Sequence, residues 1–510
     1  MSKFEKYFTK EFAHLKEKDI QIEPLLKSEM LLISGDFYGI QKFIFERLNT
    51  KNASKVIRAK SAFIQLFTVA LAQYICQKLN IDEKYILTTN AGKFEILSPN
   101  MESNVVEKVQ ELVNDYFIKK FYGLSGVSIC YTPCKKEDFL EKTKYKQLRE
   151  KIANIVEEKK FKKLNLKNQN AILSYNNNIA NQTLCKICNI RKIEHDEKCD
   201  ICSMFVKLGK DLVSNKEYVW SKKDLLIDLE NFDTKIMLNA KIKSYILKGE
   251  HDDPIDFEHL AKNSCKDLDT GVQALGILKA DVDGMGKFIK NSDITDSFEN
   301  FDLFSKTLDN FFSIYIPSKM KENFSDTYTV FAGGDDLFLV GSWDVILELA
   351  RFIHDEFSKF VVSKELTISF GIAIANPSTP ISYLAEHTEH LLEASKAIDD
   401  KKDAISLFRE TVKWKTYLST FNTLNLVFKD IKTEDTKTAF LYRLLDLCDM
   451  SKLVKQDPIN NMWKSKLVYS FVRNMDKKYT NILHPLNEMI EKYPQETKMF
   501  LSEFIYKRRD

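Results

Sequence analysis

The segment Thr327–Gly341, TYTVFAGGDDLFLVG, decides how this sequence is interpreted. Two apolar, strand-like runs, TYTVFA and LFLVG, enclose the four residues GGDD at positions 333–336. The glycines allow a tight turn and let a ligand approach the backbone closely. Two adjacent carboxylates, Asp335 and Asp336, are costly at the tip of a hairpin between buried strands unless a positive group neutralises them. The segment therefore predicts a β-hairpin with a cation-binding tip.

A second acidic pair, Asp281 and Asp283, ends the apolar stretch LGILKADVD at residues 275–283. If this strand neighbours the hairpin in one sheet, three or four carboxylates meet at one edge. Such oxygen ligands suit Mg²⁺ or Mn²⁺, and two such ions can clamp the attacking hydroxyl and the leaving pyrophosphate in nucleotidyl transfer. A solvated polar turn is the alternative for an isolated GGDD, and the preceding DVDG disfavours it.

The sequence around the second acidic pair has a counterpart earlier in the chain. DVDGMGKFI at residues 281–289 and DFYGIQKFI at residues 36–44 share five of nine ungapped positions. Each copy follows an apolar strand and precedes helical sequence, a strand–turn–strand, another helix and another strand, so the order βααββαβ occurs twice. The turn of the first copy is NAGK at residues 90–93, which places Lys93 where the other copy has an aspartate. We interpret the two copies as a duplication with one acidic turn.

Composition excludes several classes of protein. The net charge of +3 over 510 residues gives no global argument for nucleic-acid or membrane binding, and 44% hydrophobic residues fit a substantial core. No apolar run approaches the roughly 18 residues that a membrane span requires. Nine cysteines, four of them in two close pairs, are typical of a reducing compartment. We therefore expect a cytoplasmic protein without a membrane partner.

The two close cysteine pairs have the spacing of a metal site. Cys185, Cys188, Cys199 and Cys202 form CxxC–x10–CxxC, which matches a tetrahedral structural Zn²⁺ site with no open position. His195 lies between the pairs and could replace one ligand. Four unliganded thiols in a loop are the alternative interpretation.

Four features occur together along the chain: GDFYGIQKFIF at residues 35–45, the cysteine cluster, the GGDD turn and SFGIAIANP at residues 369–377. In this combination the sequence resembles the large, polymerase-like subunit of type III CRISPR effector complexes, and the Csm-type branch more than the Cmr-type. The resemblance extends from about Leu31 to Phe408. It implies an α+β fold with two ferredoxin-like palm domains of the kind found in nucleotide cyclases and GGDEF proteins.

The resemblance and the sequence patterns together predict five regions. They are a short helical leader (1–29), a first, non-catalytic palm that holds ATP (30–135), a helical linker domain (136–270) with a four-cysteine zinc ribbon (185–202), a second palm with the GGDD site (271–409) and a C-terminal helical domain (410–510).

By this resemblance, the second palm binds ATP with Mg²⁺ or Mn²⁺ through Asp281, Asp335 and Asp336, which are the catalytic residues. It joins ATP molecules 3′ to 5′, releases pyrophosphate and produces cyclic oligoadenylates. Ser369 is expected to meet an adenine edge, and Lys396 and Lys402 to lie near the triphosphate. The full set of expected nucleotide-binding residues is Gly333, Gly334, Asp283, Ser369, Lys396, Lys402, Asn90, Ala91, Gly92 and Lys93. A lysine at position 93 cannot bind Mg²⁺ but can contact phosphate as a point charge.

The resemblance also implies partners. These are the other protein subunits of a type III CRISPR complex, together with guide crRNA and target RNA held mainly by those subunits, and the RNA is expected to switch activity on. Many members of this family begin with an HD nuclease domain. Only His14 precedes the first expected palm here, so we expect no HD nuclease activity.

Three alternatives stay open at this point. Some relatives without the nuclease couple AMP to S-adenosylmethionine, and nothing in the sequence excludes that product. A GGDEF-type cyclase shares the strand–acid–turn arrangement but ends its turn in acid-Glu-Phe and normally has one palm. A catalytically silent ribonucleoprotein scaffold is disfavoured because it has no need for adjacent buried carboxylates.

Overall fold

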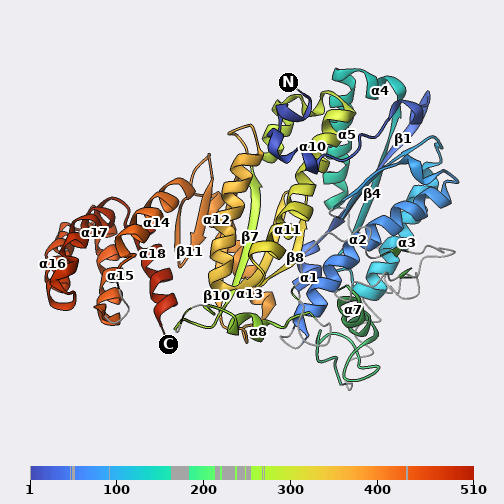
Figure 1. Cartoon of the computed structure of the whole chain (residues 1–510). Coiled ribbons are helices and arrows are strands. Elements are labelled where there is room, and N and C mark those ends of the chain that lie inside the picture. The colour runs from blue at the N-terminus through green and yellow to red at the C-terminus, as the bar shows by residue number, and fades with distance from the viewer. Residues whose placement is uncertain are drawn as a thin grey trace.

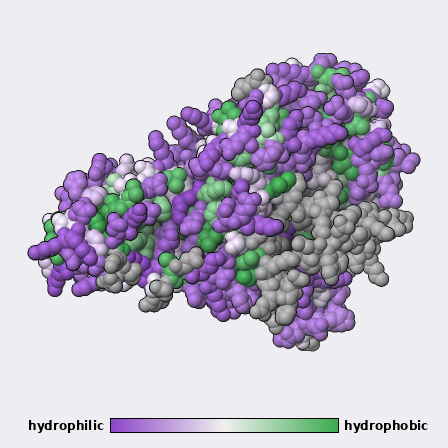
Figure 2. Space-filling view, in the orientation of Figure 1, coloured by the Kyte–Doolittle hydropathy of each residue, from purple (hydrophilic) through white to green (hydrophobic). Residues whose placement is uncertain are grey.

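The computed structural model describes residues 2–161, 183–212 and 254–509, apart from 46–47, 49–51, 91, 267, 269 and 432–434, and also the short pieces 219–220, 236–237 and 247. Two β-sheets, each covered by helices, and a set of C-terminal helices lie in a row, with the second sheet in the middle (Figure 1). The face seen in Figure 2 is largely hydrophilic, with separate hydrophobic areas over the C-terminal helices and between the two sheets.

The first sheet has the strand order β2-β3-β1-β4. Its strand β1 is almost entirely buried because helices cover both faces: α2 and α3 lie on one face and α5 on the other. The elements are β1 (Glu29–Tyr38), α1 (Ile40–Phe45), α2 (Ala53–Lys78), β2 (Ile86–Asn90), β3 (Lys93–Ser98), α3 (Ser103–Phe121), β4 (Gly126–Lys135), α4 (Lys136–Leu140) and α5 (Lys142–Phe161).

The second sheet has the order β12-β11-β10-β7-β9-β8. Within it, β10-β7-β9-β8 repeats the order β4-β1-β3-β2 of the first sheet, which is the ferredoxin-like arrangement. The predicted duplication therefore appears as two copies of one topology. The elements are β7 (Leu275–Asp283), α9 (Met285–Asn291), η7 (Asp293–Asp296), α10 (Phe298–Asn310), a π-helical turn (Phe311–Tyr315), α11 (Ile316–Asn323), β8 (Thr327–Gly333), β9 (Asp336–Ser342), α12 (Trp343–Phe360), β10 (Thr367–Ala375) and α13 (Ile381–Lys396).

The part of the chain with the first sheet (the first half, residues 29–161) packs directly against the part with the second sheet (the second half, residues 275–413). The hydroxyl of Tyr328 on β8 donates to the backbone oxygen of Ser54 on α2, and the rings of Phe45 and Phe338 lie 4.6 Å apart. By length and composition, α2 is the one helix among the described residues that could cross a membrane, but 83% of its most apolar window is buried here. Such burial is typical of the core helix of a globular protein, and α2 serves as the joint between the halves.

The expected helical leader consists of short 3₁₀ helices, and one segment near position 410 differs from the sequence-based expectation. The leader forms 3₁₀ turns, η1 (Phe4–Lys6), η2 (Lys10–Leu15) and η3 (Glu23–Leu25), and Phe8 stacks on Phe360 of the second half at 4.5 Å. The helical region does not begin at position 410. The segment forms β12 (Glu410–Lys413), which pairs with β11 (Ala404–Leu407), because alternating residues such as Val412 turn toward the core and extend the second sheet.

Helices follow from Trp414 onward and enclose a hydrophobic core of their own. They are α14 (Trp414–Phe428), α15 (Thr438–Leu453), α16 (Trp463–Asn474), α17 (Thr480–Lys492) and α18 (Pro494–Arg508). A buried ion pair joins this region to the second half, since the Arg351 guanidinium on α12 donates to both carboxylate oxygens of Glu503 on α18 at 3.0 and 3.1 Å.

The close approach of β10 to α13 is a testable feature of the second half. A Cβ at Gly371 would lie 2.4 Å from the backbone nitrogen of Leu392, so Gly371→Ala must push α13 away from the sheet. We expect a loss of about 1–3 kcal/mol of unfolding free energy, the usual cost of overpacking. The matched control is Gly286→Ala, where a Cβ meets nothing within 4 Å. Urea denaturation of both variants measures this, and equal stabilities would contradict the packing described.

Candidate functional site

The geometry of the second half brings two predicted catalytic residues together. Asp281 at the end of β7 lies directly opposite Asp336 at the start of β9, and the Lys396 ammonium on α13 contacts the Asp281 carboxylate. Burial and the charge of Asp336 raise the pKa of Asp281 to about 7, although Lys396 opposes the shift. Burial also raises the pKa of Asp336. The positive charges of Lys279 and Lys396 oppose the raised pKa of Asp336 but do not cancel the effect of burial, so the pair favours a bound cation.

Asp335 lies at the tip of the hairpin, in the turn between β8 and β9. Its backbone oxygen accepts a hydrogen bond from the Val282 amide at 3.2 Å, which ties the turn to β7. Gly334 has a φ of +66°, a conformation that favours glycine. The three aspartates therefore lie at one edge of the sheet, as the sequence predicts, and carboxylate oxygens there are suitable ligands for Mg²⁺ or Mn²⁺.

A residue that sequence reasoning missed holds this turn in place. The Gly334 amide donates to Asp309 Oδ1 at 2.9 Å, and Asp309 is 8% exposed near the end of α10. The π-helical turn Phe311–Tyr315 follows immediately. The only signal in the sequence is an acidic residue within the aromatic-rich stretch FSKTLDNFFSIY at residues 304–315.

Asp283 and Ser369 are buried and bonded to each other, and their contact with nucleotide stays a prediction. Ser369 is fully buried, and its hydroxyl donates to Asp283 Oδ2 at 2.7 Å. The same oxygen accepts from the Thr367 hydroxyl at 3.0 Å and from the Asp403 amide at 3.1 Å. In this structure the Ser369 hydroxyl therefore faces Asp283. The three bonds fasten β10 and the segment after α13 to β7.

The two predicted lysines differ in position. Lys396, in the last turn of α13, reaches Asp281 and is therefore part of the site. Lys402 lies beyond the helix in a left-handed conformation with a φ of +51°. Its side chain makes no ion pair with the three aspartates in the described part of the chain, so of the two predicted lysines only Lys396 contacts these carboxylates.

The first half carries the counterpart of this site. Asp36 on β1 is paired with Lys93 on β3, just as Asp281 is paired with Asp336. In the turn, Gly92 has a φ of +82° and its oxygen accepts from the Phe37 amide at 2.9 Å, while Ala91 lies outside the described residues. Asp36 is another residue that sequence reasoning missed, although its alignment with Asp281 in the repeated motif is a signal that could have found it.

A cavity of about 650 Å³ lies between the two halves and brings both turns together. Asp336 and Lys279 line it from the second sheet, and Asp36 and Lys93 line it from the first. The remaining lining residues are Phe37, Tyr38, Gly39, Ile40, Gln41, Lys42, Ile44, Phe45, Gly123, Leu124, Phe331, Leu337 and Phe338. A ligand in this cavity would meet a carboxylate and an ammonium from each half.

The four cysteines form a compact buried cluster. The Sγ atoms of Cys185, Cys188, Cys199 and Cys202 all lie within 4.8 Å of one another. Four sulfurs bound at about 2.3 Å from one tetrahedral zinc would lie about 3.8 Å apart, and the Cys188–Cys199 distance is 3.9 Å. The cluster therefore fits Zn²⁺ with four thiolates, and the exposed His195 is outside it.

Comparisons with known proteins agree with this arrangement. Residues 274–406 match the family described as Cas10/Cmr2, second palm domain, and residues 29–178 match the Csm1 subunit domain B. The chain belongs to the Cas10/Csm1 family. Its similarity covers both sheets, since each family domain contains one copy of the repeated topology.

Two curated relatives are called CRISPR system single-strand-specific deoxyribonuclease Cas10/Csm1 (subtype III-A). The protein from Methanocaldococcus jannaschii is 28% identical over 75% of this chain and 59% of its own length. The protein from Enterococcus italicus is 27% identical over 87% of this chain and 62% of its own length. The chain thus spans about three fifths of each relative.

Solved structures share the fold. A Csm1–Csm4 cassette in complex with cA4 has a TM-score of 0.71 at 21% identity, over 95% of this chain and 70% of the other. A Csm1–Csm4 cassette in complex with one ATP has a TM-score of 0.70 at 21% identity over the same shares.

Metal analysis tests the cysteine cluster. We expect one zinc per chain in protein purified without chelator, because the four sulfurs already have the spacing of a tetrahedral zinc site. Cys185→Ser should lower zinc content and thermal stability together, whereas Cys448→Ser, at a buried cysteine outside the cluster, should leave zinc content unchanged. Zinc well below one equivalent in a stable wild-type protein would contradict the assignment.

The Asp309–Gly334 hydrogen bond predicts a difference between two substitutions. Asp309→Ala removes the acceptor that fixes the acidic turn, and a hydrogen bond to a charged group is worth about 1.5–3 kcal/mol. We expect metal affinity at the turn, measured by Mn²⁺ titration, to weaken about tenfold or more. Asp309→Asn keeps an acceptor oxygen and should retain most of the affinity. If both variants bind Mn²⁺ like the wild type, Asp309 does not position the turn.

Proposed function

We propose that this chain is the target-RNA-activated nucleotidyltransferase subunit of a type III CRISPR interference complex and makes cyclic oligoadenylates from ATP. The observation that carries the proposal is the cavity between the halves, with Asp336 on one wall and Lys93 on the other. Related folds have been solved with ATP, cA3 and cA4. The turn with Asp336 would bind one ATP through metal ions, and the turn with Lys93 would bind the phosphates of a second ATP directly.

In the proposed reaction, the 3′ hydroxyl of one ATP loses its proton to solvent and its oxygen attacks the α-phosphorus of another. A 3′–5′ phosphodiester bond forms, the bond from the α-phosphorus to the bridging oxygen breaks, and pyrophosphate leaves with the electron pair. Asp281, Asp335 and Asp336 would hold Mg²⁺ or Mn²⁺, which stabilises the charge on the attacking and leaving oxygens when bound. Lys396, next to Asp281, adds positive charge on the same side.

The first half would hold the second ATP rather than catalyse. Lys93 replaces the metal-binding aspartate at the paired position, and an ammonium contacts phosphate as a point charge. The buried Asp36 beside Lys93 would keep that lysine oriented toward the cavity.

We propose the division into a first palm, a linker region with a zinc ribbon, a second palm and C-terminal helices on the same basis, with the last boundary at Trp414.

Control by RNA belongs to the same proposal. Relatives have been solved with a Csm4 subunit, and this chain carries a net charge of only +3. We therefore propose that partner subunits hold most of the guide and target RNA, and that the isolated chain turns over ATP slowly. Adding partner subunits with guide and target RNA, and comparing ATP turnover before and after, tests this step.

The double substitution Asp335→Ala/Asp336→Ala tests the chemistry. We expect nucleotide polymerisation to fall by about a thousandfold because the metal ligands are removed, while complex assembly stays intact because the apolar flanks hold the hairpin. The matched control is Asp355→Ala/Asp446→Ala, which removes two exposed aspartates outside the site. Polymerisation within about tenfold of wild type would rule the assignment out.

Radiolabelled ATP, with and without S-adenosylmethionine, identifies the product. Cyclic oligoadenylates formed from ATP alone support the proposal. A labelled product that forms only when S-adenosylmethionine is present would assign the same residues to AMP transfer instead.

A further inference from the structure

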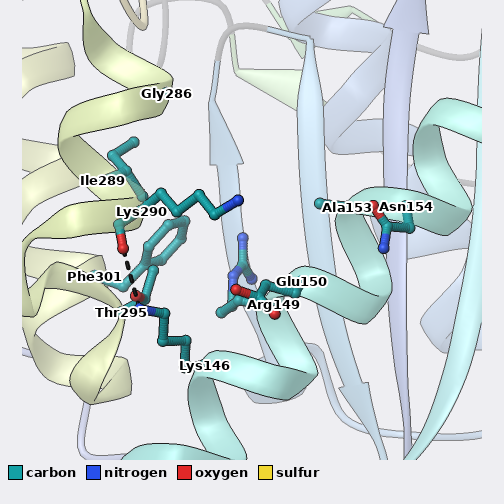
Figure 3. Close-up of a pocket in the computed structure, with 10 residues that line it drawn as sticks. All are labelled: Lys146, Arg149, Glu150, Ala153, Asn154, Gly286, Ile289, Lys290, Thr295 and Phe301. Carbon is teal, nitrogen blue, oxygen red and sulfur yellow. Dashed lines mark hydrogen bonds between the residues drawn. The ribbon is translucent and has the colours of Figure 1, made fainter.

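A second cavity lies between the halves and is not part of the acidic site. It has a volume of about 490 Å³ and lies between α5, which packs on the first sheet, and α9, which follows β7 directly. Figure 3 shows its lining residues, with Lys290 extending from α9 across the cavity toward α5. The lining residues are Lys146, Arg149, Glu150, Ala153, Asn154, Gly286, Ile289, Lys290, Thr295 and Phe301.

The walls of this cavity carry an excess of positive charge. Lys146 Nζ donates to the backbone oxygen of Lys290 at 3.1 Å, and neither lysine forms an ion pair within the described part of the chain. Arg149 is held in place by Glu95, at 2.7 and 2.8 Å, and its guanidinium stacks 3.9 Å from the Phe301 ring centroid. Three cations therefore face only two carboxylates, Glu95 and Glu150, and among the described residues two of the cations have no anionic partner.

Thr295 points to a missing hydrogen-bonding partner. This residue lines the cavity, is 6% exposed, and its hydroxyl oxygen has no hydrogen-bond partner among the described residues. Buried hydroxyls without partners are rare and cost free energy. A ligand with acceptor oxygens would satisfy this donor. There is room for such a ligand beside α9, since a Cβ at Gly286 would meet nothing within 4 Å.

We propose that this cavity is a binding site for a phosphate group, either free phosphate or the phosphate of a nucleotide, held by Lys146, Lys290 and Thr295. A phosphate dianion matches two ammonium groups and a hydroxyl donor, and charge-assisted hydrogen bonds of this kind are strong. Lys146 comes from the first half, while Lys290 and Thr295 come from the second. The bound anion would link α5 to α9 and so stabilise one relative position of the halves. The site does not depend on the proposed polymerisation chemistry.

Isothermal titration calorimetry on the full chain without added Mg²⁺ tests the proposal with three probes: inorganic phosphate, AMP and adenosine. We expect Lys146→Gln/Lys290→Gln to weaken the binding of phosphate or AMP by about tenfold or more. Thr295→Val keeps the side-chain shape and should weaken binding severalfold without loss of stability. The matched controls are Lys108→Gln, an exposed lysine on α3, and Thr307→Val, whose hydroxyl is also buried and unpaired among the described residues but lies outside the cavity. Both controls should bind like the wild type.

The probes distinguish the source of the phosphate. Equal binding of phosphate and AMP supports a site for free phosphate, whereas tighter binding of AMP supports a nucleotide. If adenosine binds as tightly as AMP, the cavity recognises the base and the proposal is wrong. It is also wrong if neither phosphate nor AMP binds, or if the cavity variants bind them like the wild type. Circular dichroism of each variant checks folding, and Lys290→Gln alone, at an exposed residue, serves as the reporter if the double variant is unfolded.

Discussion

The close opposition of two buried carboxylates, Asp281 and Asp336, is the constraint on which the acidic site depends. Opposed residues on antiparallel strands have Cα atoms only about 4.5–5.5 Å apart, so the register of β7 and β9 prevents the carboxylates from separating. Burial increases their mutual effect, as the raised pKa of Asp281 indicates. The surrounding contacts hold this unfavourable arrangement in place: Lys396 supplies one positive charge, and Asp309 fixes the backbone of the turn.

Much of the fold and part of the site could be predicted from the sequence. The glycine-bearing turns, the repeated motif and the apolar runs between them follow from local physical rules, and these rules predict the order of elements along the chain in both halves. The cysteine spacing likewise predicted a compact cluster. Only ten residues separate the two CxxC pairs, so a short loop can bring all four sulfurs together. Asp281 and Asp336 were predictable as neighbours because each lies at the end of an apolar strand. The two acids meet if those strands are adjacent in one sheet, as they are here.

What could not be predicted depended on side-chain direction and on contacts distant in sequence. Ser369 and Asp283 lie on the strands expected, but a hydroxyl opposite a carboxylate can face a ligand or its own neighbour, and periodicity does not distinguish the two. Asp309 acts on a turn 25 residues away through a single hydrogen bond. The strand at Glu410–Lys413 is only four residues long, too short for its alternation to stand out beside the helical sequence that follows.

The packing of α2 between the halves has a consequence for how such a protein is controlled. A site assembled from two separate copies forms and dissolves with concentration, so dilution alone switches it off. Here both walls belong to one chain and are joined by Tyr328, Ser54 and an aromatic contact, so each wall is present at a high effective concentration near the other. Dilution of the chain alone therefore does not take this cavity apart. A change in the angle or spacing of the two walls would alter the cavity without separating them.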